Sequence, residues 1–196
     1  MNGRRILLIQ GHPDAPPHLC HALAAAYAAG AGAAGHQVRT CEVAPLDFPL
    51  LRSQRAWEKE PLPPALQQAQ DDLRWAEHIV LFFPLWLGDM PALLKAFLEQ
   101  VMRPGFAFAY DQRGTAFTRK GLGGRSARVV VTMGMPALVY RWYFRAHSVK
   151  SLERNILGFV GIAPVRETLI GSVAGLKEDA AQQWLDKLEK LGRQAQ

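Results

Sequence analysis

The chain has 196 residues, 49% of them hydrophobic and 20% charged, a composition typical of one globular domain spanning residues 1–196. Its longest apolar run, near Ile79 to Leu87, is much shorter than the roughly 20 residues of a membrane-spanning helix, so we expect a cytoplasmic protein. The two cysteines, Cys20 and Cys41, lie 21 positions apart and form no CxxC motif, which argues against a disulfide framework or a structural zinc site. A net charge of +6 fits a solvated basic surface and attraction of phosphate equally well, and no nucleic-acid-binding motif accompanies it.

Four apolar runs have the length and the β-branched or aromatic content of buried strands. They are Arg5 to Gln10, Val38 to Val43, His78 to Pro84 and Arg128 to Met133. An alternating run at Val165 to Gly171 predicts a fifth strand at a sheet edge. Because helical patterns separate these runs, the sequence predicts an α/β domain with a parallel sheet.

Four segments carry helical patterns: Leu19 to Ala34, Ala65 to Ala76, Pro91 to Arg103 and Leu176 to Gly192. The third has the clearest apolar face, with Asp89 as its expected N-cap. Two irregular stretches, Leu46 to Pro64 and Pro104 to Gly124, interrupt the alternation, and connections of this length are often functional.

Ligands of open parallel α/β sheets bind beyond the carboxyl ends of the strands, where the winding reverses direction. The first loop there, Gly11 to His18, reads GHPDAPPH and leads into a helix, whose free N–H groups and dipole favour phosphate. Its prolines lack N–H groups and it has no hydroxyl side chain, so His12 and His18 are the predicted donors. For either histidine alone, a plain turn or surface residue is the alternative.

The second loop, Pro84 to Met90, is apolar where a polar turn is usual, which suits a flat apolar ligand. A hydrophobic staple for the next helix is the alternative. The third loop, beginning at Thr132, offers polar groups at Gly134, Tyr140 and His147, while its aromatic cluster is more typical of a core or a dimer interface. Other nucleotide and hydrolase motifs, such as GxxxxGK[ST], GxGxxG before a helix, and GxSxG, are absent from the sequence.

Three segments together carry a family resemblance: GHPD after the first strand, FFPLWLGDMPALLKAFLEQVMRPGFAFAY from Phe82 to Tyr110, and VTMGMP from Val131 to Pro136. They resemble the flavodoxin-like NAD(P)H:quinone oxidoreductase family, which includes quinone reductases, modulators of drug activity and ancillary subunits of potassium-efflux systems. The resemblance implies a flavodoxin-like three-layer sandwich with a five-stranded parallel sheet in the order 2-1-3-4-5.

The resemblance also implies a role for each loop. The flavin phosphate would be held by the side chains of His12 and His18 and the N–H groups of Leu19 and Cys20. The flavin ring would be lined by Pro84, Leu85, Trp86 and Leu87. The polar edge of the ring would be approached by Thr132, Met133 and Gly134. The catalytic residues near the acceptor would be Tyr140 and His147.

The implied activity is ping-pong hydride transfer from NAD(P)H through a flavin, FAD or possibly FMN, to a quinone. The implied assembly is a homodimer, and neither a metal nor a nucleic acid is expected. The alternative is a flavin-binding regulatory subunit of a membrane transporter of the potassium-efflux type, which would act as a peripheral partner at the membrane.

Overall fold

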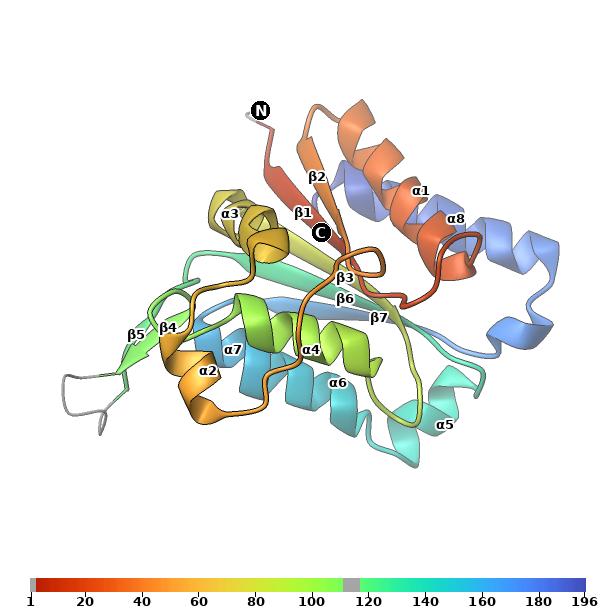
Figure 1. The fold of residues 1–196 in the computed structure, drawn as a ribbon. Coiled ribbons are helices and arrows are strands. Elements are labelled where there is room, and N and C mark those ends of the chain that lie inside the picture. Colours follow the sequence, from red (N-terminus) through yellow and green to blue (C-terminus); the bar gives the residue numbers. More distant parts are fainter. Residues whose placement is uncertain (1–2, 111–116) are drawn as a thin grey trace.

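A computed structural model describes residues 3–110 and 117–196 (Figure 1). Its central sheet contains five parallel strands in the order β2-β1-β3-β6-β7. They are β1 (Arg5–Gln10), β2 (Gln37–Glu42), β3 (His78–Pro84), β6 (Ser126–Thr132) and β7 (Val165–Ile170). Counted among sheet strands only, this is the order 2-1-3-4-5, so the predicted fold and strand order are confirmed.

Helices cover both faces of the sheet (Figure 1). On one face lie α1 (Leu19–Ala33) and α8 (Glu178–Arg193), which pack on each other and on alternate residues of β1, β3 and β6. Close approach of the two helices depends on glycine, since a Cβ at Gly30 would lie 1.9 Å from the Glu189 carbonyl oxygen. On the other face lie α3 (Gln67–Trp75) and α4 (Ala92–Val101).

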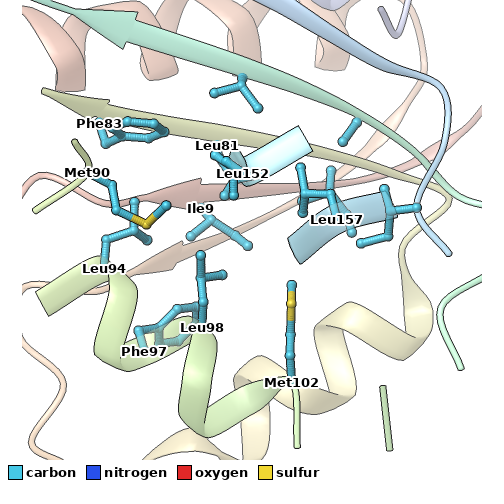
Figure 2. Packing of buried hydrophobic residues seen from close by; sticks show 14 of the residues in the cluster. Ile9, Leu81, Phe83, Met90, Leu94, Phe97, Leu98, Met102, Leu152 and Leu157 are labelled. Carbon is cyan, nitrogen blue, oxygen red and sulfur yellow. The ribbon is translucent and has the colours of Figure 1, made fainter. Parts of the chain in front are cut away.

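The core between the sheet and α4 fixes the helix that follows β3. Every residue of β3 is buried, because the strand is central and covered on both faces. Figure 2 shows side chains of the sheet packed against those of α4, among them Ile9, Leu81, Phe83, Leu94, Phe97 and Leu98. The helix begins at Ala92, and Asp89 does not cap it as predicted, because its carboxylate accepts from the adjacent N–H of Met90 at 2.7 Å.

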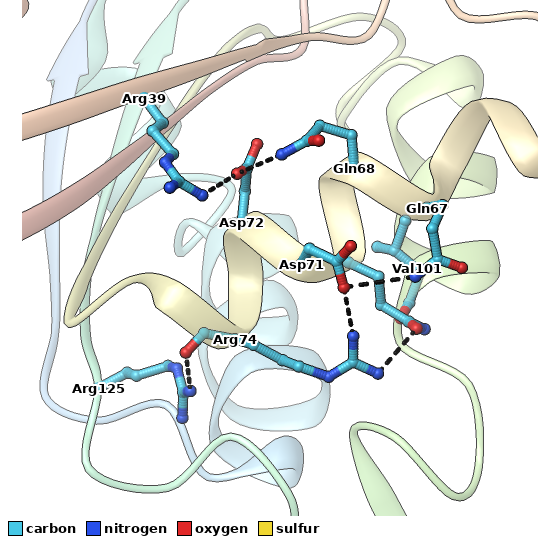
Figure 3. Close-up of polar contacts among 9 residues, drawn as sticks. Arg39, Gln67, Gln68, Asp71, Asp72, Arg74, Val101 and Arg125 are labelled. Carbon is cyan, nitrogen blue, oxygen red and sulfur yellow. Dashed lines mark hydrogen bonds and ion pairs between the residues drawn. The ribbon is translucent and has the colours of Figure 1, made fainter.

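A polar network holds α3 against the sheet edge (Figure 3). The Arg39 guanidinium of β2 donates to the buried Asp72 carboxylate at 2.8 Å, and the Gln68 side chain donates to the same oxygen at 2.9 Å. Arg39 also lies over the Trp75 ring, 4.2 Å from its centre. The Arg125 guanidinium donates to the Arg74 carbonyl at 2.8 Å, which ties the C-terminal end of α3 to the chain before β6.

The irregular stretches contain short elements that the sequence pattern did not predict. The first holds α2 (Gln54–Lys59) and η1 (Pro64–Leu66), and the second holds the antiparallel pair β4 (Phe108–Tyr110) and β5 (Phe117–Lys120). Between β6 and β7 the chain forms α5 (Ala137–Trp142), α6 (His147–Ser151), the π-helical turn η2 (Leu152–Leu157) and α7 (Gly158–Val160), and η3 (Val173–Gly175) precedes α8. These elements are too short to show a helical or strand period in the sequence.

Candidate functional site

The three loops singled out by the sequence begin side by side at the carboxyl edge of the sheet. The strands before them, β1, β3 and β6, are neighbours. The N–H of Gly11 donates to the Phe82 carbonyl at 2.7 Å, and the N–H of Leu85 donates to the Thr132 carbonyl at 2.7 Å. Because β1 leads to a helix on one face and β3 to a helix on the other, this edge is where the winding reverses.

Hydrogen bonds within the first loop fix the orientation of His12. The residue is 8% exposed, and its backbone N–H donates to the Gln10 side chain at 3.1 Å. Its Nδ1 accepts from the N–H of Asp14 at 3.1 Å. A neutral ring that accepts at Nδ1 carries its proton on Nε2, so His12 is a hydrogen-bond donor at Nε2.

Three imidazoles gather at the start of α1. His12 and His18 are stacked with ring centres 4.0 Å apart, and His21 lies 5.3 Å from His12 and 5.7 Å from His18. His18 Nε2 is paired with the Asp14 carboxylate at 3.2 Å, whereas Nδ1 of His21 is buried without a hydrogen-bond partner. Burial, reinforced by the neighbouring His18, lowers the pKa of both His12 and His21.

The first turn of α1 adds backbone donors to this histidine cluster, by which we mean His12, His18 and His21. His18 is the N-cap residue, and no side chain caps the helix. The N–H groups of Leu19 and Cys20 therefore have no intrahelical acceptor. The Cys20 side chain is 1% exposed, and burial raises the pKa of its thiol to about 12, so only the backbone of Cys20 is suited to contact a ligand.

The second loop turns sharply and exposes two large apolar side chains. Pro84 is buried at the end of β3, and Leu85 packs against the core. Trp86 and Leu87 are 50% and 107% exposed, and the Trp86 ring meets the His12 ring edge-on at 6.0 Å. The N–H groups and carbonyls of Trp86 and Asp89 pair across a turn whose central residues, Leu87 and Gly88, both have positive φ, 48° and 81°.

A leucine in this left-handed conformation is strained by about 1–2 kcal/mol, and full exposure of its side chain offers no compensating burial. Strain of this kind concentrates at functional positions. The four residues predicted to line the flavin ring, Pro84 to Leu87, therefore fall into two pairs. Pro84 and Leu85 belong to the core, and Trp86 and Leu87 form the exposed apolar part.

The third loop is open at Gly134. Thr132 and Met133 are buried, and the Met133 N–H is bonded to the Ile170 carbonyl at 2.8 Å. Gly134 is exposed, and a Cβ there would meet no atom within 4 Å. At Gly171, by contrast, a Cβ would lie 2.2 Å from the Ala137 nitrogen, so glycine lets this loop pass close to the end of β7.

The two residues predicted to act on the acceptor lie in different environments. Tyr140 is 2% exposed, and its hydroxyl is 2.6 Å from Ser148 Oγ and accepts from the Val149 N–H at 3.3 Å. In this structure the hydroxyl thus holds α5 to α6, and either oxygen of the Tyr140–Ser148 pair can be the donor. His147 is exposed and follows Arg145 and Ala146, which have positive φ of 52° and 50°. Their catalytic roles stay predictions.

His21 is the site residue that the sequence reasoning missed. It lies three positions after His18 on α1, so one helical turn places both on the same face. That spacing was the available signal. The aromatic cluster of the third loop, for which the sequence left a core and a dimer interface as alternatives, is exposed and continues a row of large apolar side chains on α5: Leu138, Val139, Trp142, Tyr143 and Phe144.

Within residues 3–110 and 117–196, no helix combines the length and hydropathy that a membrane span requires. The same residues contain no group of three or more His, Cys, Asp or Glu side chains placed to hold a metal ion.

Comparison with known proteins places these features in context. Residues 4–191 match a family described by its flavodoxin-like fold. The chain is 26% identical over 178 residues to an FMN-dependent NADH:quinone oxidoreductase of Nitratidesulfovibrio vulgaris, covering 82% of both chains. It superposes with a TM-score of 0.81 on the crystal structure of Smu.1420 from Streptococcus mutans UA159, at 26% identity and 96% and 98% coverage. The NAD(P)H:quinone oxidoreductase of Methanothermobacter marburgensis also gives 0.81, at 21% identity and 99% and 100% coverage.

Proposed function

The chain belongs to the family with the flavodoxin-like fold, and we propose that it is a flavin-dependent NAD(P)H:quinone oxidoreductase. The observation that carries the proposal is the junction of two unlike surfaces at one sheet edge. A cluster of imidazoles and free helix N–H groups meets an exposed tryptophan, and the rings of His12 and Trp86 touch at that junction. The name of the Nitratidesulfovibrio relative supports the same reaction.

The polar half of this junction fits a phosphate group. Around the helix start there are three kinds of group that suit an anion. The first-turn N–H groups and the Nε2 of His12 are donors, and the unpartnered buried Nδ1 of His21 is a protonation site. Such a buried nitrogen without a partner is unfavourable unless a ligand or water satisfies it. The described residues therefore fit the phosphate end of a flavin.

The apolar half fits a flat ring. Trp86 and Leu87 present apolar surface that no part of the described chain covers, and Gly134 leaves the neighbouring loop open. We propose FMN rather than FAD, which the sequence analysis placed first. One compact donor cluster suits a single phosphate, and the relative from Nitratidesulfovibrio is named as FMN-dependent.

When bound, the flavin supplies the hydride chemistry between nicotinamide and quinone. The residues of the chain bind and orient it: the histidine cluster and the start of α1 hold the phosphate, and the Trp86–Leu87 turn fixes the ring and excludes water from one side. Exposed His147 is our proposed proton donor to the acceptor. Tyr140 holds α5 against α6 through its hydroxyl and so positions His147, the first residue of α6.

We also propose that the protein works as a homodimer in the cytoplasm. The apolar side chains on α5 and the Trp86–Leu87 turn expose more large hydrophobic groups than a monomer usually leaves uncovered. A second copy of the chain covering the row of side chains on α5 would leave the Trp86–Leu87 turn free for the flavin ring. The fold and the similarities offer no observation that favours the alternative of a transporter subunit.

The test is to purify the protein, add FMN or FAD, and record the absorption spectrum after removal of free flavin. The proposal expects a yellow protein that retains FMN and oxidises NADH or NADPH only when a quinone such as menadione is present. A protein that retains neither flavin, or that retains FMN but reduces no quinone, would refute it. Size-exclusion chromatography with light scattering tests the dimer separately.

A further inference from the structure

We propose that the histidine cluster captures the flavin phosphate together with a proton, which His21 accepts, so that FMN binding weakens as the pH rises through neutrality. The inference rests on the proposed function and adds a regulation of the same site. Its structural basis is that no hydroxyl side chain is available in the first loop and imidazoles stand at the helix start instead.

The hydrogen bonds single out His21 as the ring that takes the proton. His12 cannot be protonated at Nδ1 without losing the bond from the Asp14 N–H. His18 already shares its Nε2 with the Asp14 carboxylate. His21 has a buried Nδ1 with no partner, so protonation there breaks no contact and converts the ring into a donor at both nitrogens.

In the absence of a bound anion, burial and the neighbouring charges favour the neutral form of His21. Burial and His18 lower its pKa, while Glu42 at the end of β2 and Asp14 in the loop oppose this less strongly. His21 also lines a cavity of about 330 Å³ between α1 and β2, and the charged side chain that lines it is the Glu42 carboxylate, so an anion fits on the side of His21 that faces His12 and His18 and not in this cavity. A phosphate dianion placed against the cluster would add its negative charge to those of Glu42 and Asp14 and raise the pKa of His21.

The sign of the pH effect follows from this shift. Between the pKa of His21 in the free protein and its raised pKa in the complex, the complex holds a proton that the free protein lacks. Affinity for FMN is therefore greatest below the pKa of the free protein, and it declines as the pH rises toward the pKa of the complex. The second ionisation of a phosphate ester lies near pH 6, so above about pH 7 the ligand stays a dianion and a change in affinity there reports the protein. Riboflavin, which has no phosphate, would show no such dependence.

The experiment measures FMN and riboflavin dissociation constants between pH 6.5 and 8.5 by quenching of flavin fluorescence. We expect the FMN constant to rise with pH by up to about tenfold per unit, the limit for one linked proton, and the riboflavin constant to stay flat. Calorimetry of FMN binding in buffers of different ionisation enthalpy should show net proton uptake at pH 7.

His21→Asn keeps a hydrogen-bonding side chain but cannot titrate, so its FMN constant should become nearly independent of pH and its proton uptake should vanish. His36→Asn is the matched control, since His36 contacts Arg4 and Arg193 and is not part of the cluster. Tight FMN binding by the unaltered protein with no pH dependence would overturn the inference and leave the proposed function intact. A pH dependence retained in His21→Asn would overturn the assignment to His21. Absence of all flavin binding would overturn the proposed function itself.

Discussion

Replacing Leu87 with asparagine should make the protein more stable and its flavin site weaker. Leu87 has a φ of 48° and its side chain is 107% exposed, so the leucine bears left-handed strain with no burial in return. Asparagine tolerates this conformation, and Asn-Gly is the preferred pair for a turn whose two central residues both have positive φ. The folded state thus loses no packing and is relieved of strain.

The change in the free energy of unfolding follows from the strain that is relieved, since no packing is lost. Left-handed conformation costs leucine about 1–2 kcal/mol, and asparagine avoids about half of that cost, so we expect a gain of about 0.5–1 kcal/mol. For a domain of this size the gain raises the melting temperature of the flavin-free protein by about 1–4 °C. Loss of part of the apolar contact with the ring, about 1 kcal/mol, should raise the FMN dissociation constant about fivefold.

The assay is thermal unfolding of the flavin-free protein, together with FMN titration. Leu50→Asn is the matched control, because Leu50 is also exposed, at 59%, but has no positive φ, so the same exchange there should give no stabilisation. A lower melting temperature for Leu87→Asn would mean that Leu87 packs in the folded protein. An unchanged FMN constant would remove Leu87 from the proposed site.

Three further results are expected. Trp86→Ala should raise the FMN dissociation constant about tenfold, because an aromatic stacking partner is lost, while urea unfolding changes by less than about 1 kcal/mol since the ring is 50% exposed; equal losses would make Trp86 a folding residue. Cys20 and Cys41 should resist iodoacetamide at pH 8 in the folded protein, because burial raises the pKa of each thiol to about 12; rapid labelling detected by mass spectrometry would contradict this. Burial and nearby arginines lower the pKa of His78 from 6.5 to about 4, so between these two pH values His78 is protonated in the unfolded chain and neutral in the folded protein. The contribution of His78 to stability is fully present above pH 6.5 and should fall by about 2 kcal/mol between pH 7 and pH 5, so the decline measured by urea titrations should be smaller by that amount in His78→Gln.

The sequence alone predicted the sheet and the edge at which a ligand site is expected. Strand runs and helix patterns are local signals, since burial on both faces makes β3 apolar throughout and a helix shows its period within a few turns. The strand order, which the family resemblance implied, was correct, and parallel strands with helices on both faces leave one edge for ligand-binding loops. GHPD and the Trp86 segment were therefore recognisable as loops at that edge before any contact was known.

The tertiary structure decided which atoms of those residues are available. It showed that the hydroxyl of Tyr140 is held by Ser148, that Pro84 is buried, and that His21 joins the cluster with an unpartnered nitrogen. It also showed the positive φ of Leu87. Hydrogen-bond partners, burial and strained backbone depend on residues distant in sequence, because they arise only when separate loops meet at the sheet edge, and no local periodicity records them.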